Sequence, residues 1–175
     1  MAITRTGKAK EHFEKAEEIL DAAFDLEPDS DEDKEERRKA IAEYTEVIKL
    51  LPNDAESYSE RGSLYRELEE EEKALDDFNK AISLDPKGGI HYYRRAGLNL
   101  ELAEIEKAKA DIEKSVELEP SKAGERYCFF ADQMLSKTGN KKEAAVYYKK
   151  SVEHGDYIDY QKKPAAKTKL AELGM

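Results

Sequence analysis

The apolar residues of this chain recur in a pattern with a period of 34 residues. Three prolines, Pro52, Pro86 and Pro120, mark that period. Before each proline, apolar and small residues return at helical spacings, as in Ala40…Tyr44…Val47, Ala74…Phe78…Ala81 and Ala108…Ile112…Ser115. Self-similarity of this kind predicts stacked supersecondary units, none of which can bury its apolar face alone.

The clearest unit spans residues 55–88. Tyr58, Gly62 and Tyr65 are four and three residues apart, which marks one face of a helix that ends near residue 68. A second helix is predicted after a short turn, and Pro86 ends it, because the residue before a proline is pushed out of the α region. Small residues on facing positions let two helix axes approach to about 8–10 Å. The unit therefore predicts a pair of packed helices.

These residues closely resemble the tetratricopeptide repeat. That family's pattern of about 34 residues has aromatic residues at positions 4, 11 and 24, small residues at 8, 20 and 27, and proline at 32. Numbered from Ala55, the chain matches every one of these positions, with Tyr58, Gly62, Tyr65, Ala74, Phe78, Ala81 and Pro86. The resemblance implies an all-α fold, a right-handed α-solenoid of about four helix pairs whose first (A) helices line a concave groove.

The resemblance extends over nearly the whole chain. We predict a single solenoid domain, 1–175, with repeats at about 8–54, 55–88, 89–122 and 123–155. An acidic insertion at 26–36 divides the first repeat, and a capping helix at about 160–173 is expected to shield the last one. In the third repeat, Asn99 stands where the family has an aromatic residue, with Leu98 and Leu100 beside it.

The first helix of the fourth repeat fits the family pattern in two registers. Numbered from Glu125, Gly139 falls on position 15, but Asp132 takes the small-residue position 8. Shifted by one residue, Tyr127 takes position 4 and Ala131 takes position 8, which requires an extra residue before Gly139. The sequence leaves both registers open.

The resemblance also implies which residues face the groove. In the second repeat they are plain polar residues, such as Glu60, Ser63 and Glu67. In the third and fourth repeats they include aromatic residues and arginines, which binding hot spots favour. We predict a peptide-binding surface made of Tyr93, Arg94, Arg126, Phe129, Phe130 and Gln133. The alternative is that Phe130 and Tyr93 pack between helices; in the shifted register Phe130 becomes a core residue, whereas Phe129 faces the groove in both.

One subgroup of the family clamps the C-terminal carboxylates of chaperone tails with a Lys, Asn, Asn, Lys, Arg set. At the corresponding positions this chain offers Glu14, Glu18, Glu60, Ile90 and Arg94, or, one repeat later, Ser59, Ser63, Arg94, Arg126 and Phe130. Neither set makes the clamp, so recognition of that kind is not expected.

The function expected is a non-enzymatic protein-protein interaction scaffold that binds a peptide or helical segment of a partner in the groove. A self-associating assembly protein is one alternative, because residues 137–175 hold nine Lys against five acids while the chain as a whole has a formal net charge of −10. A regulatory segment of a larger system is another. Such an acidic chain repels phosphate backbones, so no nucleic-acid partner is expected.

Few residues suggest chemistry. Asp29, Asp31 and Asp33 have the alternate spacing with which a calcium loop begins, but Lys34 stands where glycine is needed for the sharp turn, and Ala40 where the bidentate Glu should be. A solvated loop is expected instead, with Ser30 or Asp31 capping the helix that follows. No catalytic or metal site and no cofactor is predicted.

The sole cysteine, Cys128, lies in an apolar run and is expected to be a buried residue. With no signal-peptide or membrane-spanning run, we expect a cytoplasmic monomer or weak homo-oligomer without membrane insertion.

Overall fold

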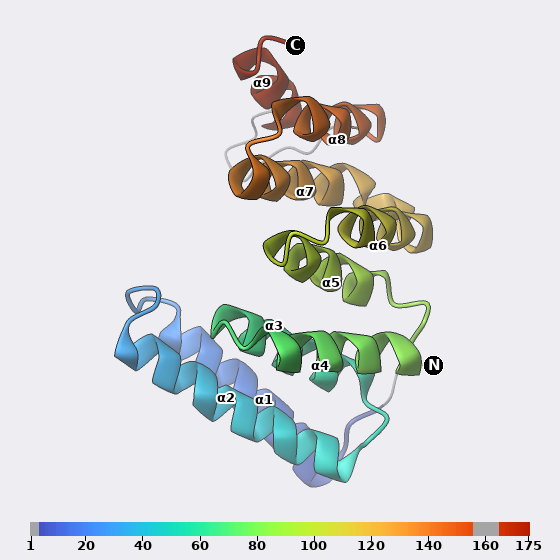
Figure 1. The fold of residues 1–175 in the computed structure, drawn as a ribbon. Coiled ribbons are helices and arrows are strands. Elements are labelled where there is room, and N and C mark those ends of the chain that lie inside the picture. Colours follow the sequence, from blue (N-terminus) through green and yellow to red (C-terminus); the bar gives the residue numbers. More distant parts are fainter. Residues whose placement is uncertain (1–3, 156–164) are drawn as a thin grey trace. The chain divides into compact units, whose positions relative to one another are not determined.

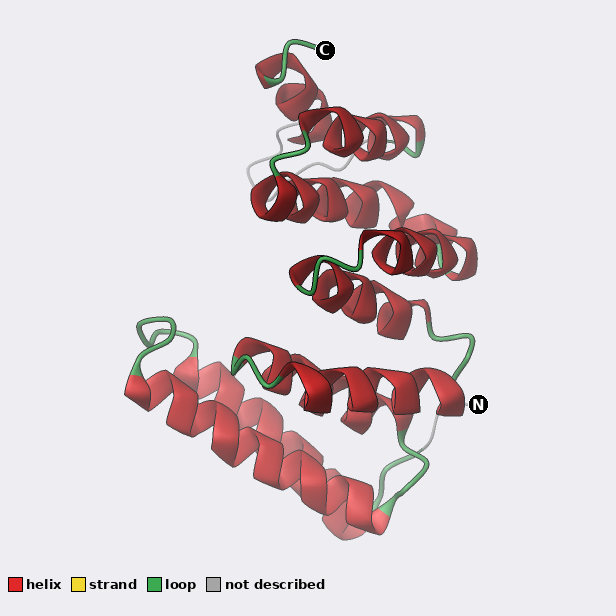
Figure 2. Ribbon diagram, in the orientation of Figure 1, coloured by secondary structure: helices red, strands yellow, loops and turns green. Residues whose placement is uncertain are grey.

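The computed structural model describes residues 4–155 and 165–175, and its regular secondary structure in those ranges is helical (Figures 1 and 2). The predicted all-α repeat fold is confirmed. Its internal contacts divide the chain into two compact units, Met1–Lys87 and Gly88–Met175. The single solenoid domain and its right-handed stacking stay predictions.

The first unit contains two antiparallel helix pairs. Helices α1 (Gly7–Ala23) and α2 (Asp31–Leu50) pack on each other, as do α3 (Ala55–Glu67) and α4 (Glu71–Leu84), and α2 also contacts α3. Phe13 of α1 and Tyr44 of α2 meet edge to face with ring centroids 5.4 Å apart, and both are buried in one apolar cluster. Gly62 lies so close to Phe78 that an added Cβ would sit 3.0 Å from the ring. The small residue at this position therefore lets α3 approach α4.

The second unit continues with the same pairing. It contains α5 (Gly89–Glu101), α6 (Ile105–Leu118), a 3₁₀ turn η1 (Pro120–Lys122), α7 (Ala123–Thr138), α8 (Lys141–Glu153) and α9 (Ala165–Glu172). Helix α5 packs on α6, α7 on α8, and α8 on α9. Of the capping helix expected at about 160–173, residues 160–164 lie outside the described residues. Within the described part, Ala166 of α9 is fully buried in the apolar cluster of this unit.

The proline period fixes where three helices end. Helices α2, α4 and α6 each end two residues before Pro52, Pro86 and Pro120, respectively. The residues just before these prolines have nearly the same backbone angles, with φ between −133° and −130° and ψ between 72° and 81°. Since a proline excludes its predecessor from the α region, the same local rule stops each B helix at the same repeat position.

The acidic insertion is shorter than the predicted range, 26–36. Helix α2 already begins at Asp31, so only the first half of that range forms the loop. The Ser30 hydroxyl accepts a hydrogen bond from the Asp33 amide at 3.1 Å, which satisfies one of the amides at the helix start. The acidic residues of the first turn also interact favourably with the positive end of the helix dipole. The acids at 31–36 therefore start a helix rather than prolong a loop.

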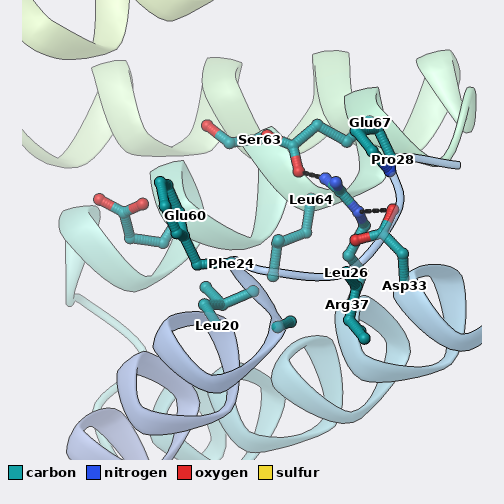
Figure 3. A pocket seen from close by; sticks show the side chains of 11 residues that line it. Leu20, Phe24, Leu26, Pro28, Asp33, Arg37, Glu60, Ser63, Leu64 and Glu67 are labelled. Atoms are coloured by element: carbon teal, nitrogen blue, oxygen red, sulfur yellow. Dashed lines mark hydrogen bonds and ion pairs between the residues drawn. The ribbon is translucent and has the colours of Figure 1, made fainter.

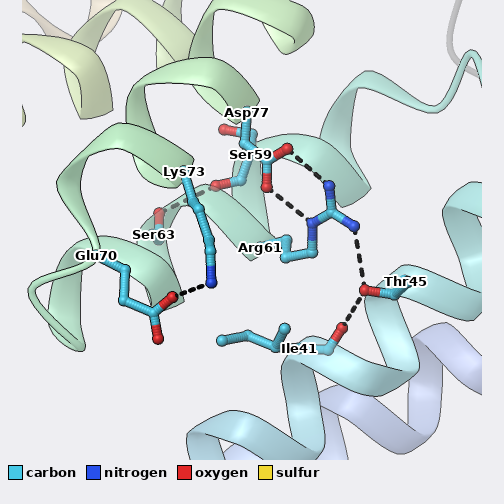
Figure 4. Close-up of polar contacts among 8 residues, drawn as sticks. All are labelled: Ile41, Thr45, Ser59, Arg61, Ser63, Glu70, Lys73 and Asp77. Atoms are coloured by element: carbon cyan, nitrogen blue, oxygen red, sulfur yellow. Dashed lines mark hydrogen bonds and ion pairs between the residues drawn. The ribbon is translucent and has the colours of Figure 1, made fainter.

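An arginine–aspartate pair joins the two helices of a repeat at equivalent places in the second and third repeats. Arg61 of α3 donates two hydrogen bonds to Asp77 of α4, both at 2.8 Å, and a third to Thr45 of α2 (Figure 4). One period later, Arg95 of α5 donates two to Asp111 of α6, at 2.8 and 2.7 Å. Bidentate pairs of this kind fix both distance and orientation.

The hydrogen bond made by Asn99 explains why a polar residue stands where the family has an aromatic one. Its side chain is buried, and Nδ2 donates a hydrogen bond to Asp111 at 3.0 Å. The carboxylate of Asp111 thus accepts from both Arg95 and Asn99. A polar side chain at this position completes a buried polar cluster, and the neighbouring Leu98 and Leu100 are both buried.

Candidate functional site

Two side-chain contacts, one near each end of the helices, join α5 and α7 in the second unit. The guanidinium of Arg126 lies 5.6 Å from the ring centroid of Tyr93. Farther along the same two helices, Lys137 and Glu101 form an ion pair at 3.8 Å. Arg94, Phe129 and Gln133 lie along the helices between these two contacts. We call these three residues the α5–α7 surface.

Phe129 is the large apolar residue of this surface. Its side chain is 39% exposed, whereas the residues on either side of it, Cys128 and Phe130, are buried. Arg94 and Gln133 are half-buried, and so is Tyr93, which packs against the apolar cluster. The surface thus places an aromatic ring, a guanidinium and an amide within reach of solvent.

Arg126 is buried among contacts within the fold. It is only 5% exposed, and Nη1 donates to the backbone carbonyl of Ser115 at 2.9 Å and to its hydroxyl at 2.7 Å. Nη2 donates to Glu119 at 2.6 Å. The Ser115 carbonyl also accepts from the Glu119 amide at 3.1 Å, so Arg126 adds a second, charged donor at the end of α6. This buried position does not fit the predicted ligand contact of Arg126.

Phe130 is also a core residue. It is 1% exposed and meets Tyr147 edge to face at 4.7 Å between ring centroids. Ala131 is fully buried and Tyr127 nearly so, whereas Asp132 is half-exposed and accepts a hydrogen bond from Tyr148 at 2.7 Å. This pattern matches the shifted register, and the 16 residues of α7, against 13 for α3 and α5, accommodate the extra residue. The core position of Phe130 fits the alternative, packing between helices, and does not fit the predicted ligand contact.

A pocket of about 320 Å³ in the first unit was not predicted (Figure 3). It lies between the end of α1, the loop that follows, the start of α2 and one face of α3. Its apolar lining consists of Leu20, Ala23, Phe24, Leu26, Pro28 and Leu64, and its polar lining of Asp33, Arg37, Glu60, Ser63 and Glu67. We call it the insertion pocket, because the loop of the acidic insertion forms part of its wall.

Arg37 holds one wall of the insertion pocket together. Its Nε donates to Asp33 at 3.0 Å, and its Nη1 pairs with Glu67 of α3. Asp33 also accepts a hydrogen bond from the Asp29 amide at 3.0 Å. The hydrogen bond from Arg37 is the main reason that the pKa of Asp33 is lowered below its usual value. The Asp33 carboxylate thus holds the loop to α2, and the Arg37 guanidinium joins α2 to α3.

Carboxylates of α1 and α3 face one another beside this pocket. The pKa of Glu17 is raised above its usual value, first by partial burial and then by repulsion from Glu56, Glu60 and Asp21. Glu60 belongs both to this group and to the pocket lining. Arg5 pairs with Glu56 and offsets part of this charge, but the acids outnumber it, so the charge beside the insertion pocket is negative.

The sequence pattern does not reveal this pocket, because each of its lining residues is unremarkable when taken alone. Glu60, Ser63 and Glu67 are predicted to face the groove in the second repeat, but polar residues at such positions do not indicate a binding site. The sequence feature that could have indicated the pocket is in the insertion, where Phe24, Leu26 and Pro28 interrupt an otherwise acidic stretch. Apolar residues in a solvated loop indicate that the loop packs against another part of the fold.

Other chemistry finds no support among the described residues. Within residues 4–155 and 165–175, no group of three or more His, Cys, Asp or Glu side chains is placed to hold a metal ion. Cys128 is buried, as its apolar neighbours predict. In the same ranges, no helix combines the length and apolarity that spanning a membrane requires.

Two family models settle what the repeats are. Models of the tetratricopeptide repeat match residues 55–87 and 92–122. The chain is a tetratricopeptide repeat protein. The predicted resemblance is thereby confirmed. No curated protein matches this tetratricopeptide repeat protein.

Solved structures of tetratricopeptide repeat proteins share its fold. MamA (residues 41 to the end) from Desulfovibrio magneticus RS-1 is 16% identical over 98% of this chain and 96% of that one, with a TM-score of 0.68. The first TPR of Spaghetti (RPAP3), bound to the HSP90 peptide SRMEEVD, is 27% identical over 65% and 80%, with a TM-score of 0.55. The TPR2B domain of yeast Sti1, in complex with pHsp70, is 24% identical over 83% and 97%, with a TM-score of 0.55.

Proposed function

We propose that this tetratricopeptide repeat protein is a non-enzymatic interaction module that binds an extended or helical segment of a partner protein on the α5–α7 surface. The observation that carries the proposal is Phe129, a large aromatic side chain exposed between two contacts that align α5 and α7. The peptide-bound structure of the RPAP3 repeat supports the class of ligand.

The chemistry of the surface suggests what the segment carries. An exposed ring gains most from an apolar side chain that covers it, since aromatic residues bury a large area. Arg94 lies on the neighbouring helix, and a guanidinium pairs bidentately with a carboxylate. Gln133 follows Phe129 by one helical turn and offers both a donor and an acceptor. The expected segment therefore combines an apolar residue with an acidic one.

Peptide selection tests this function. Short random peptides displayed on phage are selected against the full chain, and the affinities of the enriched peptides are measured for the wild type and for the double variant Arg94→Ala, Phe129→Ala. Loss of two hot-spot side chains is expected to weaken binding at least about tenfold. The proposal is contradicted if every enriched peptide binds the double variant as tightly as it binds the wild type.

A matched control excludes a general effect of removing exposed side chains. Val146 of α8 is 49% exposed and Lys142 lies one turn before it, so Lys142→Ala, Val146→Ala removes a similar pair from another surface of the same unit. This control is expected to bind as the wild type does. Circular dichroism of each variant shows that the helices are retained.

A further inference from the structure

The insertion pocket has room for a ligand side chain. Its volume is about 320 Å³, and an apolar cavity of roughly 150 Å³ already holds a benzene molecule. Leu20, Leu26 and Leu64 supply apolar walls from α1, the loop and α3. A pocket with mostly apolar walls and a few polar groups is the usual form of a specific binding site.

Phe24 leaves an aromatic ring exposed at the edge of this pocket. It is the C-cap residue of α1, and its side chain is 87% exposed. Figure 3 shows it on the same side of the pocket as Glu60, while Arg37 and Glu67 close the other side. A ligand that enters the pocket also covers this ring, so binding removes apolar area of both partners from water.

Contacts within the protein hold the wall of the insertion pocket in place. The Asp33–Arg37–Glu67 contacts join the loop to α2 and α3, and the Asp29 amide bonds to the same carboxylate. A preformed wall reduces the ordering that binding would otherwise require.

The charges around the pocket select the kind of ligand. Partial burial raises the pKa of Glu17 on α1, and repulsion from Glu56 and Glu60 of α3 and from Asp21 raises it further. Arg5, paired with Glu56 at 2.7 Å, offsets part of this repulsion. Arg37 is the only basic residue in the described lining, and Asp33 and Glu67 already pair with it. A cationic ligand relieves this repulsion, whereas an acidic one adds to it.

We infer that the insertion pocket is a second docking site, which accepts a large apolar side chain from a basic segment of a partner protein. Phe24 and the leucine walls hold the apolar side chain, and Glu60 with the neighbouring carboxylates holds flanking Lys or Arg residues. The inference goes beyond the proposed function, because it concerns other residues, another unit and a ligand of opposite charge.

Two variants with matched controls test it. Phe24→Ala removes the exposed ring, and Leu50→Ala removes an apolar residue that is 47% exposed in the same unit but does not line the pocket. Glu60→Gln removes a lining charge, and Glu46→Gln removes a charge that pairs with Lys49 on α2. None of these four side chains belongs to the core, so the fold is expected to survive each change.

The probe is a set of short random peptides displayed on phage, selected against the full chain carrying Arg94→Ala and Phe129→Ala. We expect enrichment of peptides in which an aromatic or large aliphatic residue is flanked by Lys or Arg. Their affinity should fall about tenfold with Phe24→Ala or Glu60→Gln, stay unchanged with both controls, and weaken as salt increases.

Three results would overturn the inference. One is that no enriched peptide loses affinity with Phe24→Ala. Another is that acidic peptides are enriched in place of basic ones. The last is that the wild type self-associates in light scattering and Phe24→Ala abolishes this, since the occupant is then a second copy of the chain. Because the selection target lacks Arg94 and Phe129, these three results concern only the insertion pocket and do not contradict binding on the α5–α7 surface. Likewise, failure of the binding proposed for the α5–α7 surface does not contradict the insertion pocket.

Discussion

Arg126 donates a hydrogen bond from Nη1 to the backbone carbonyl of Ser115 over 2.9 Å. This contact ties the start of α7 to the end of α6. Gly89, the first residue of α5, lies against the same pair: a Cβ built there would be 2.8 Å from the Ser115 carbonyl and 2.9 Å from Arg126 Nη1. Three helices therefore meet where only a glycine fits.

The first prediction concerns this junction. Gly89→Ala forces a Cβ against a backbone carbonyl, which cannot turn aside as a flexible side chain can. We expect the free energy of unfolding to fall by about 1–3 kcal/mol, measured by urea denaturation. The neighbouring substitution Ile90→Ala changes a partly exposed residue and should cost less. Equal stability of Gly89→Ala and the wild type would show that the junction relaxes.

The turns between A and B helices give the second prediction. Glu69 and Ala103, one period apart, both have φ of 58°, and Gly139 has φ of 67° in the corresponding turn. Left-handed backbone is strained for residues with a Cβ. Ala103→Gly should raise the free energy of unfolding by about 0.5–1 kcal/mol, and Gly139→Ala should lower it by about 1 kcal/mol.

An added Cβ at Gly139 meets nothing within 4 Å, so the effect there is purely conformational. Thermal and urea unfolding of the two variants check the opposite signs. A loss of stability with Ala103→Gly would mean that the entropy of the unfolded chain outweighs the relief of strain.

The third prediction tests the arginine–aspartate pair of the second repeat. Arg61→Met leaves the buried Asp77 without its bidentate partner. Loss of hydrogen bonds to a charged group should lower the free energy of unfolding by about 2–3 kcal/mol. Lys114→Met, which breaks an exposed pair with Glu117, should cost at most about 0.5 kcal/mol. Similar small values for both variants would contradict a structural role for the pair.

The fourth prediction follows from the lowered pKa of Asp33. A carboxylate with a depressed pKa in the folded state stabilises the fold above its unfolded pKa, and this stabilisation is lost as the pH falls through the folded pKa. Asp33→Asn should therefore lower the unfolding midpoint at neutral pH, and the difference from the wild type should shrink below about pH 4. Thermal unfolding from neutral to acidic pH measures this. A difference that does not change with pH would exclude the Arg37 ion pair as its cause.

Local rules made the fold predictable. The prolines at 52, 86 and 120 stop three helices through the geometry of a single peptide unit. The spacing of Tyr58, Gly62 and Tyr65 depends only on helical periodicity. Such signals lie within a few residues of the structure they determine, so the sequence alone is enough to locate the helices.

The sites were harder to predict because their determinants lie far apart in the chain. Arg126 looked like a ligand-binding residue until the structure placed it against Ser115, eleven residues earlier. One extra residue in α7 decides whether Phe130 faces the core or the surface. The insertion pocket joins Phe24 to Glu60 and Glu67 of α3, a juxtaposition that only tertiary packing creates.

Photo-crosslinking at position 129 tests whether a partner segment binds where we propose. A benzophenone-bearing phenylalanine analogue replaces Phe129 in one sample and Val146 in another, and each is irradiated with the peptides selected on the wild-type chain. We predict a crosslinked peptide from position 129, reduced by Arg94→Ala, and none from position 146. Crosslinking at 146 alone, or equal crosslinking at both positions, would contradict binding on the α5–α7 surface.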